Sequence, residues 1–196
     1  MKFSLPLLSS CVLLAAAITA PAATPAVREC VPGPPTAASY NWDFQHEANG
    51  IFQDVQTDAR LIRSQADRLE SYERGPQLSW QSHAAKLDAI KGEVNDMGRK
   101  LCRLETIRRT LAPWQQAEVD RIAGVVPRLA SETRGAILFG GDHQHTLWLA
   151  TYEKYTDSLY NQSSKLANSI NEAVKYARVS KDYREVSHEL GLPAAS

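Results

Sequence analysis

Apolar residues recur at steps of three and four between residues 80 and 111, and no other feature of this sequence constrains the fold as much. The members of this stripe are Trp80, Ala84, Leu87, Ile90, Val94, Met97, Leu101, Leu104, Ile107 and Leu111. Such spacing predicts a long helix with one apolar side. A stripe of this kind packs against a similar stripe on another helix, so the segment predicts an architecture of helix against helix. It indicates no chemistry.

Three more segments repeat this pattern. They are residues 42–73 before Gly75-Pro76, the stretch from Pro113 to Gly140-Gly141, and the stretch that follows Asp142 and continues to Ala177, with a short last turn over residues 181–190. Their expected core positions include Ala117, Ile137, Tyr152 and Tyr155. The first, second and fourth helices would each be about 50 Å long. Helices of matched length favour an all-α, antiparallel four-helix bundle.

The junction at Ala112-Pro113 leaves an alternative topology. Proline suits the first turn of a new helix, where its missing N–H costs nothing. However, no glycine precedes Pro113 to supply a left-handed cap for the helix before it. The chain either reverses at Pro113 or continues through it as one kinked rod.

The amino-terminal residues have the pattern of a secretion signal. Lys2 is followed by an apolar run over residues 5–20, and Ala20-Pro21-Ala22 offers the small residues that precede a signal-peptidase cut. We expect residues 1–22 to be removed and the protein to be periplasmic or secreted. Lipidation at Cys11 is the alternative, which the position of Cys11 in the middle of the apolar run disfavours. Residues 23–40 are rich in Pro and Ala and predict an extended leader before a helical domain at residues 41–192.

The charge balance favours no class of partner. Removal of residues 1–22 takes away one cation, Lys2, and no anion, which leaves a formal charge of −1. A nucleic-acid-binding protein would show a basic excess or a recognisable module, and neither is present. No stretch after the signal is apolar enough to predict a transmembrane span.

Cysteine usage predicts one disulfide. Loss of Cys11 with the signal leaves Cys30 and Cys102 as an even pair in an oxidising compartment. A bridge between them would attach the leader to the flank of the second helix. Two free thiols and links between chains are the alternatives.

One loop motif points to a metal. Asp142-His143-Gln144-His145 places two imidazoles and a carboxylate in a polar loop, which is a start of a site for a divalent transition metal. The alternative is an ordinary loop in which Asp142 or Thr146 caps the fourth helix. Glu185 and His188 have the spacing found in di-iron bundles, but those sites need two such pairs and this chain has one.

No sequence motif indicates catalysis. The chain lacks G-x-S-x-G, P-loop and H-E-x-x-H patterns. Carboxylates such as Asp58 and Glu93 are expected on solvated helix flanks, and His46 and His83 at the rim near helix amino ends. A site assembled from distant flank residues would leave no trace in spacing.

Two groups of side chains are candidates for a partner surface. The first is the basic set Arg99, Arg103, Arg108 and Arg109, and the second contains Trp148 and Tyr160. The arginines also suit the carboxyl end of a helix dipole and nearby carboxylates, which is the simpler explanation for them. The sequence therefore favours an exported, noncatalytic interaction or structural protein of the envelope or periplasm, whose partner is an unknown protein or envelope component. A homodimer is compatible with the pattern, and a metal-binding bundle is the alternative function.

Overall fold

The computed structural model describes residues 43–73 and 79–190. The expected signal, the leader at residues 23–40 and Cys30 lie outside these residues. Within them, no helix combines the length and the hydropathy that a membrane crossing requires.

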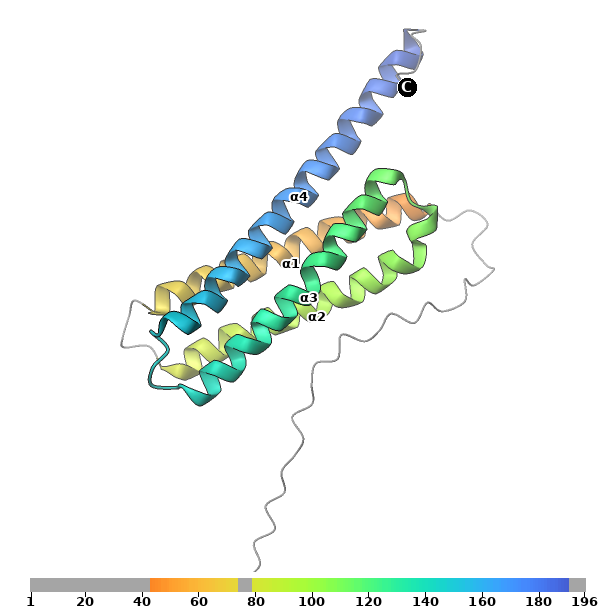
Figure 1. The fold of residues 1–196 in the computed structure, drawn as a ribbon. Helices are drawn as coiled ribbons and strands as arrows, with labels where there is room; N and C mark the ends of the chain where they lie inside the picture. Colours follow the sequence, from red (N-terminus) through yellow and green to blue (C-terminus); the bar gives the residue numbers. More distant parts are fainter. Residues whose placement is uncertain (1–42, 74–78, 191–196) are drawn as a thin grey trace, which may run out of the picture.

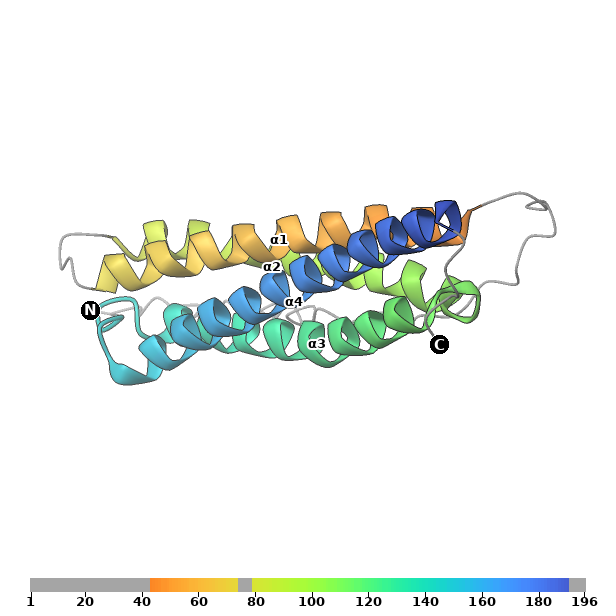
Figure 2. The same ribbon diagram turned by 90° about the horizontal axis from the view of Figure 1, so that it is seen from above.

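The described residues form four long helices and one short turn. These elements are α1 (Phe44–Glu73), α2 (Trp80–Ile107), the 3-10 turn η1 (Arg108–Thr110), α3 (Pro113–Asp142) and α4 (Ala150–Glu189). Each helix packs against the two that lie beside it, so that α1 is opposite α3 and α2 is opposite α4 (Figures 1 and 2). The prediction of an all-α, antiparallel four-helix bundle is confirmed.

The chain reverses between α2 and α3, which excludes the kinked rod. Pro113 is the first residue of α3. The buried side chain of Gln115 fixes the turn, because its Oε1 accepts the N–H of Ala112 at 2.9 Å. Its Nε2 donates to Gln45 O at 2.9 Å and to Asn49 Oδ1 at 3.0 Å, both on α1. One amide therefore joins the start of α3 to the start of α1, and no glycine cap is required.

The stripe of α2 is buried as predicted from Leu87 to Ile107, but its beginning is different. His83 is buried, whereas Ala84 is exposed and Trp80 is 37% exposed. The reason is helical phase, since regular steps back from Leu87 place a core position at residue 83. The expectation that His83 lies at the rim was wrong. In α3 the same effect leaves Ala117 and Ile137 exposed, while Ala136 is in the core.

Helix α4 is longer than the others and extends past them (Figure 1). The separate last turn predicted at residues 181–190 was wrong, because the helix continues to Glu189. Neither glycine nor proline occurs between Asp142 and Leu190, so nothing in the sequence breaks this helix. Val174 is the last apolar residue of α4 that packs against the core.

Candidate functional site

The Asp142–His145 segment comprises the end of α3 and the turn that follows it. Asp142 is the last residue of α3 and does not cap α4, and His143 follows as the C-cap. The His143 ring stacks on Phe139, with centroids 4.1 Å apart and an interplanar angle of 8°. Its Nδ1 also lies 3.1 Å from Phe139 O. His143 therefore closes the end of α3.

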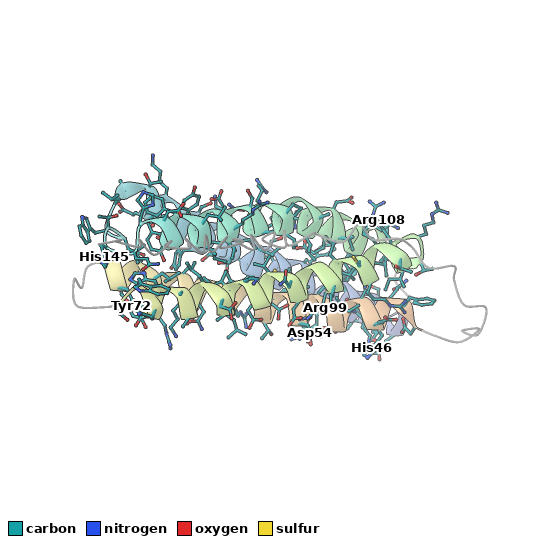
Figure 3. All side chains as sticks on the ribbon, turned by 90° about the horizontal axis from the view of Figure 1, so that it is seen from below. His46, Asp54, Tyr72, Arg99, Arg108 and His145 are labelled. Carbon is teal, nitrogen blue, oxygen red and sulfur yellow. The ribbon has the colours of Figure 1, made fainter. Side chains whose placement is uncertain are left out.

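No group of three or more His, Cys, Asp and Glu side chains suitable for a metal ion occurs in the described part of the chain. His145 lies at the same end of the bundle as Tyr72 (Figure 3). Nothing in the arrangement of Asp142, His143 and His145 favours a metal over the loop interactions just described.

Three of the four candidate arginines are paired with carboxylates. Arg103 makes a two-pronged contact with Glu47 at the start of α1, with N–O distances of 2.6 and 3.0 Å. This hydrogen bond to Glu47 is the main cause that raises the pKa of Arg103. Arg108 on η1 likewise contacts both carboxylate oxygens of Asp120 on α3 at 2.7 Å.

The other two arginines of this set are on the surface. Arg99 pairs with Asp96 one turn earlier in α2, and Arg109 is exposed. Figure 3 places Arg99 and Arg108 apart along the bundle. Arg103 and Arg108 therefore link different helical elements, and carboxylates balance three of the four arginines.

A pocket of about 330 Å³ lies at the end of the bundle where α2 begins and α3 ends. It is mostly apolar, with Trp80, Leu87, Ile137, Gly140 and Leu147 among its lining residues. The charged lining residues Asp88 and Lys91 are 3.9 Å apart and well exposed. Among the described lining residues, the pocket brings together no set of nucleophile, base and orienting group.

His83 is the buried polar group of this end pocket. Its Nδ1 lies 3.2 Å from the hydroxyl of Tyr152, which is fully buried on α4. The His83 ring also meets Tyr72 of α1 edge-on, with centroids 5.5 Å apart. Burial lowers the pKa of His83 because it removes water from the charged form. The neutral imidazole thus joins three helices.

The predicted aromatic surface divides into core and exposed members. Tyr152 is in the core and Tyr155 is partly buried, whereas Trp148 is 65% exposed in the turn before α4. Tyr160 is 36% exposed on α4. Because Tyr160 lies about 15 Å along α4 from its first residue, Ala150, whereas Trp148 lies in the turn before that helix, the two do not form one surface.

Two polar clusters between helices were not predicted from the sequence. Lys100 Nζ contacts Asp58 Oδ2 at 2.6 Å between α2 and α1, and the Asp58 side chain is 8% exposed. Partial burial and the negative charge of Asp58 raise the pKa of nearby Glu93. The second cluster joins α3 to α4, where buried Glu118 accepts from Arg121 at 2.5 Å and from Ser169 at 2.9 Å. The expectation of a solvated flank was wrong for Asp58.

The projecting part of α4, together with Leu190 directly after it, carries an apolar stripe of its own. Its members recur at steps of three and four residues, and each side chain is 51% to 66% exposed. They are Tyr176, Val179, Tyr183, Val186 and Leu190. We call them the tail stripe. Ile170 and Tyr176 are six residues apart, or about 240° around a helix, so the tail stripe lies on a different face from the core residues of α4. The spacing of the tail stripe is regular in the sequence, but the predicted core stripe of the fourth helix, which continues to Ala177, does not include it.

Comparisons with protein-family models, with curated proteins and with solved structures find no match to this chain.

Proposed function

We propose that this chain is an exported, noncatalytic interaction protein of the cell envelope or periplasm, and that it binds a partner helix through the tail stripe. The observation that carries the proposal is the tail stripe itself, five apolar side chains in heptad spacing and mostly exposed. Exposed apolar patches of this kind mark interaction sites. Heptad spacing fits a helix as the partner, because knobs on one helix fill holes on another.

The bundle supports this function as a rigid base. Its interhelical contacts are completed by buried polar side chains such as Gln115 and Glu118, and its core ends at Val174. The projecting helix begins inside this packed core, so its first turns are already formed. A partner would therefore not bear the cost of nucleating the helix.

A photoreactive amino acid tests the proposal in the exporting cell. Placed at Tyr183, on the tail stripe, it should give one crosslinked protein, identified by mass spectrometry. Placed at Lys181, on the opposite side of the same turn, it should give none. The adduct at Tyr183 should disappear when Tyr176→Ser and Val186→Ser are combined. Equal adducts at both positions, or none at Tyr183, would contradict binding through the tail stripe.

Elemental analysis tests the alternative function. A metal-binding bundle would copurify with stoichiometric metal when no His tag is used, and His143→Ala and His145→Ala would each remove it. That result would replace the interaction function as the leading hypothesis.

A further inference from the structure

We propose that the helix bound by the tail stripe is the tail stripe of a second copy of this chain, packed antiparallel. This inference rests on the proposed function, because it names the partner of the same surface. Size, charge and symmetry support it independently.

The sizes of the stripe residues match in the antiparallel arrangement. In an antiparallel pair of tail stripes, Tyr176 faces Val186 of the other copy, and Val179 faces Tyr183. Two-fold symmetry repeats each of these two pairs, which gives four layers. Each layer contains one large side chain, a tyrosine, and one small side chain, a valine. A parallel pair would instead place tyrosine against tyrosine and valine against valine, which alternates crowded and underfilled layers.

The charges beside the stripe also favour the antiparallel arrangement. Lys175, Asp182 and Glu189 occupy equivalent positions one residue before a stripe residue. In the antiparallel register, Lys175 of each copy faces Glu189 of the other, which gives two attractive pairs. Asp182 faces its own copy at the axis, a single repulsive pair. A parallel register places no carboxylate of the other copy against Lys175, whose neighbour there would be Ser180.

The contacts of Lys175 within one copy do not prevent this pairing. Lys175 Nζ is 3.2 Å from Glu172 Oε1, and both side chains are more than 60% exposed. Exposed pairs of this type contribute little and exchange readily. Lys175 and Glu189 of one copy are about 21 Å apart along the helix and do not pair with each other.

Two-fold symmetry makes this assembly finite. The same surface is used on both copies, so a dimer leaves no stripe open for a third chain. The segment from residue 175 to 190 is about 24 Å long, which limits the buried area. We therefore expect a reversible dimer with a Kd on the order of micromolar.

The leader is a weaker candidate to cover the stripe. Residues 23–40 lack heptad spacing and are rich in proline. The predicted Cys30–Cys102 bridge would also hold the leader on α2, which is diagonal to α4. Coverage by the leader would make the protein a monomer, which the first experiment detects.

Sedimentation equilibrium of the mature chain from 1 to 200 µM, a range chosen to span a micromolar Kd, tests the dimer. We expect a reversible monomer–dimer equilibrium. Val179→Ser combined with Tyr183→Ser should raise the Kd by about tenfold or more, because apolar area is lost on both copies. The matched control, Arg178→Ser with Lys181→Ser, should change it by less than about twofold, because exposed charges off the interface contribute little. Circular dichroism should show equal helicity in both variants.

Two variants test the orientation. Asp182→Cys should form a disulfide-linked dimer under mild oxidation, because residue 182 meets its own copy. Lys175→Cys should not, because residue 175 faces residue 189 of the other copy. Lys175→Glu should weaken the dimer several-fold, and addition of Glu189→Lys should restore it. Crosslinking of Lys175→Cys in preference to Asp182→Cys, or no rescue by the charge swap, would overturn the antiparallel register.

The outcomes separate this inference from the proposed function. A protein that stays monomeric at 200 µM while the Tyr183 adduct contains a different protein would refute self-association and leave the proposed function intact. A dimer unaffected by the tail-stripe substitutions would refute the inference by placing the interface elsewhere. A monomer with no Tyr183 adduct would refute both.

Discussion

His83 on α2 and Tyr152 on α4 meet across the diagonal of the bundle, with Nδ1 and the hydroxyl oxygen 3.2 Å apart. Helices α2 and α4 are not neighbours, so this contact crosses the core at its end. Which of the two atoms donates depends on the imidazole tautomer. When Nδ1 accepts from the Tyr152 hydroxyl, the ring must be neutral with its proton on Nε2, and when Nδ1 donates, the hydroxyl oxygen accepts.

The burial of His83 predicts that the protein loses stability in mild acid. The pKa of His83 is lowered in the folded state by burial, whereas in the unfolded chain it is about 6.5. Between these two pKa values the unfolded chain binds more protons, so the free energy of unfolding decreases as pH falls below about 6.5. Urea unfolding at pH 7.5, 6.5 and 5.5 measures the effect.

The matched control separates His83 from the other titrating groups. His83→Gln should be less stable at pH 7.5 but should show a smaller decrease between pH 7.5 and 5.5. His46→Gln, near the exposed start of α1, should keep the decrease of the natural protein. An unchanged pH dependence in His83→Gln would show that another group is responsible.

The same residue shows what the sequence could and could not predict. The regular spacing from Leu87 to Leu104 was sufficient for a helical bundle, because heptad periodicity depends on local geometry alone. The choice between His83 and Ala84 depends on phase, and apolarity favoured the wrong residue. The pairs Arg103–Glu47 and Lys100–Asp58 join residues more than forty positions apart, so no local spacing indicates them. The exposure of the tail stripe depends on where the other helices end, which the sequence of α4 does not contain.

Two glycines of α3 should respond oppositely to alanine. A Cβ at Gly135 would lie 2.5 Å from the Tyr155 ring, whereas a Cβ at Gly124 has nothing within 4 Å. Gly124→Ala should therefore stabilise the protein by about 0.5–1 kcal/mol through helix propensity. Gly135→Ala should destabilise it by about 1–3 kcal/mol, because Tyr155 must move out of its packed position. Chemical denaturation of both variants provides the comparison, and stabilisation by Gly135→Ala would show that Tyr155 is free to move.

Removal of one partner of the Lys100–Asp58 ion pair, which joins α2 to α1, should destabilise the protein. Lys100→Met removes the cation 2.6 Å from the buried Asp58 and leaves that carboxylate near Glu93. We expect a loss of about 1–3 kcal/mol in the free energy of unfolding. Asp58→Asn added to Lys100→Met should recover part of the loss, because no unpaired charge then stays buried. A double-mutant cycle measures the coupling, and additive losses would indicate that the two side chains act independently.

The predicted Cys30–Cys102 bridge should strengthen the fold without creating it. Cys102 is partly buried on α2, and Cys30 lies outside the described residues, so the pairing stays a prediction. Closing a loop of this length stabilises a protein by about 4 kcal/mol in the chain-entropy model. Reduction should therefore lower Tm while the helical circular dichroism spectrum is retained, because the buried stripes do not depend on the bridge. Mass spectrometry of nonreduced peptides should find the two cysteines in one crosslinked peptide. Two alkylatable thiols in the native exported protein would disprove the bridge.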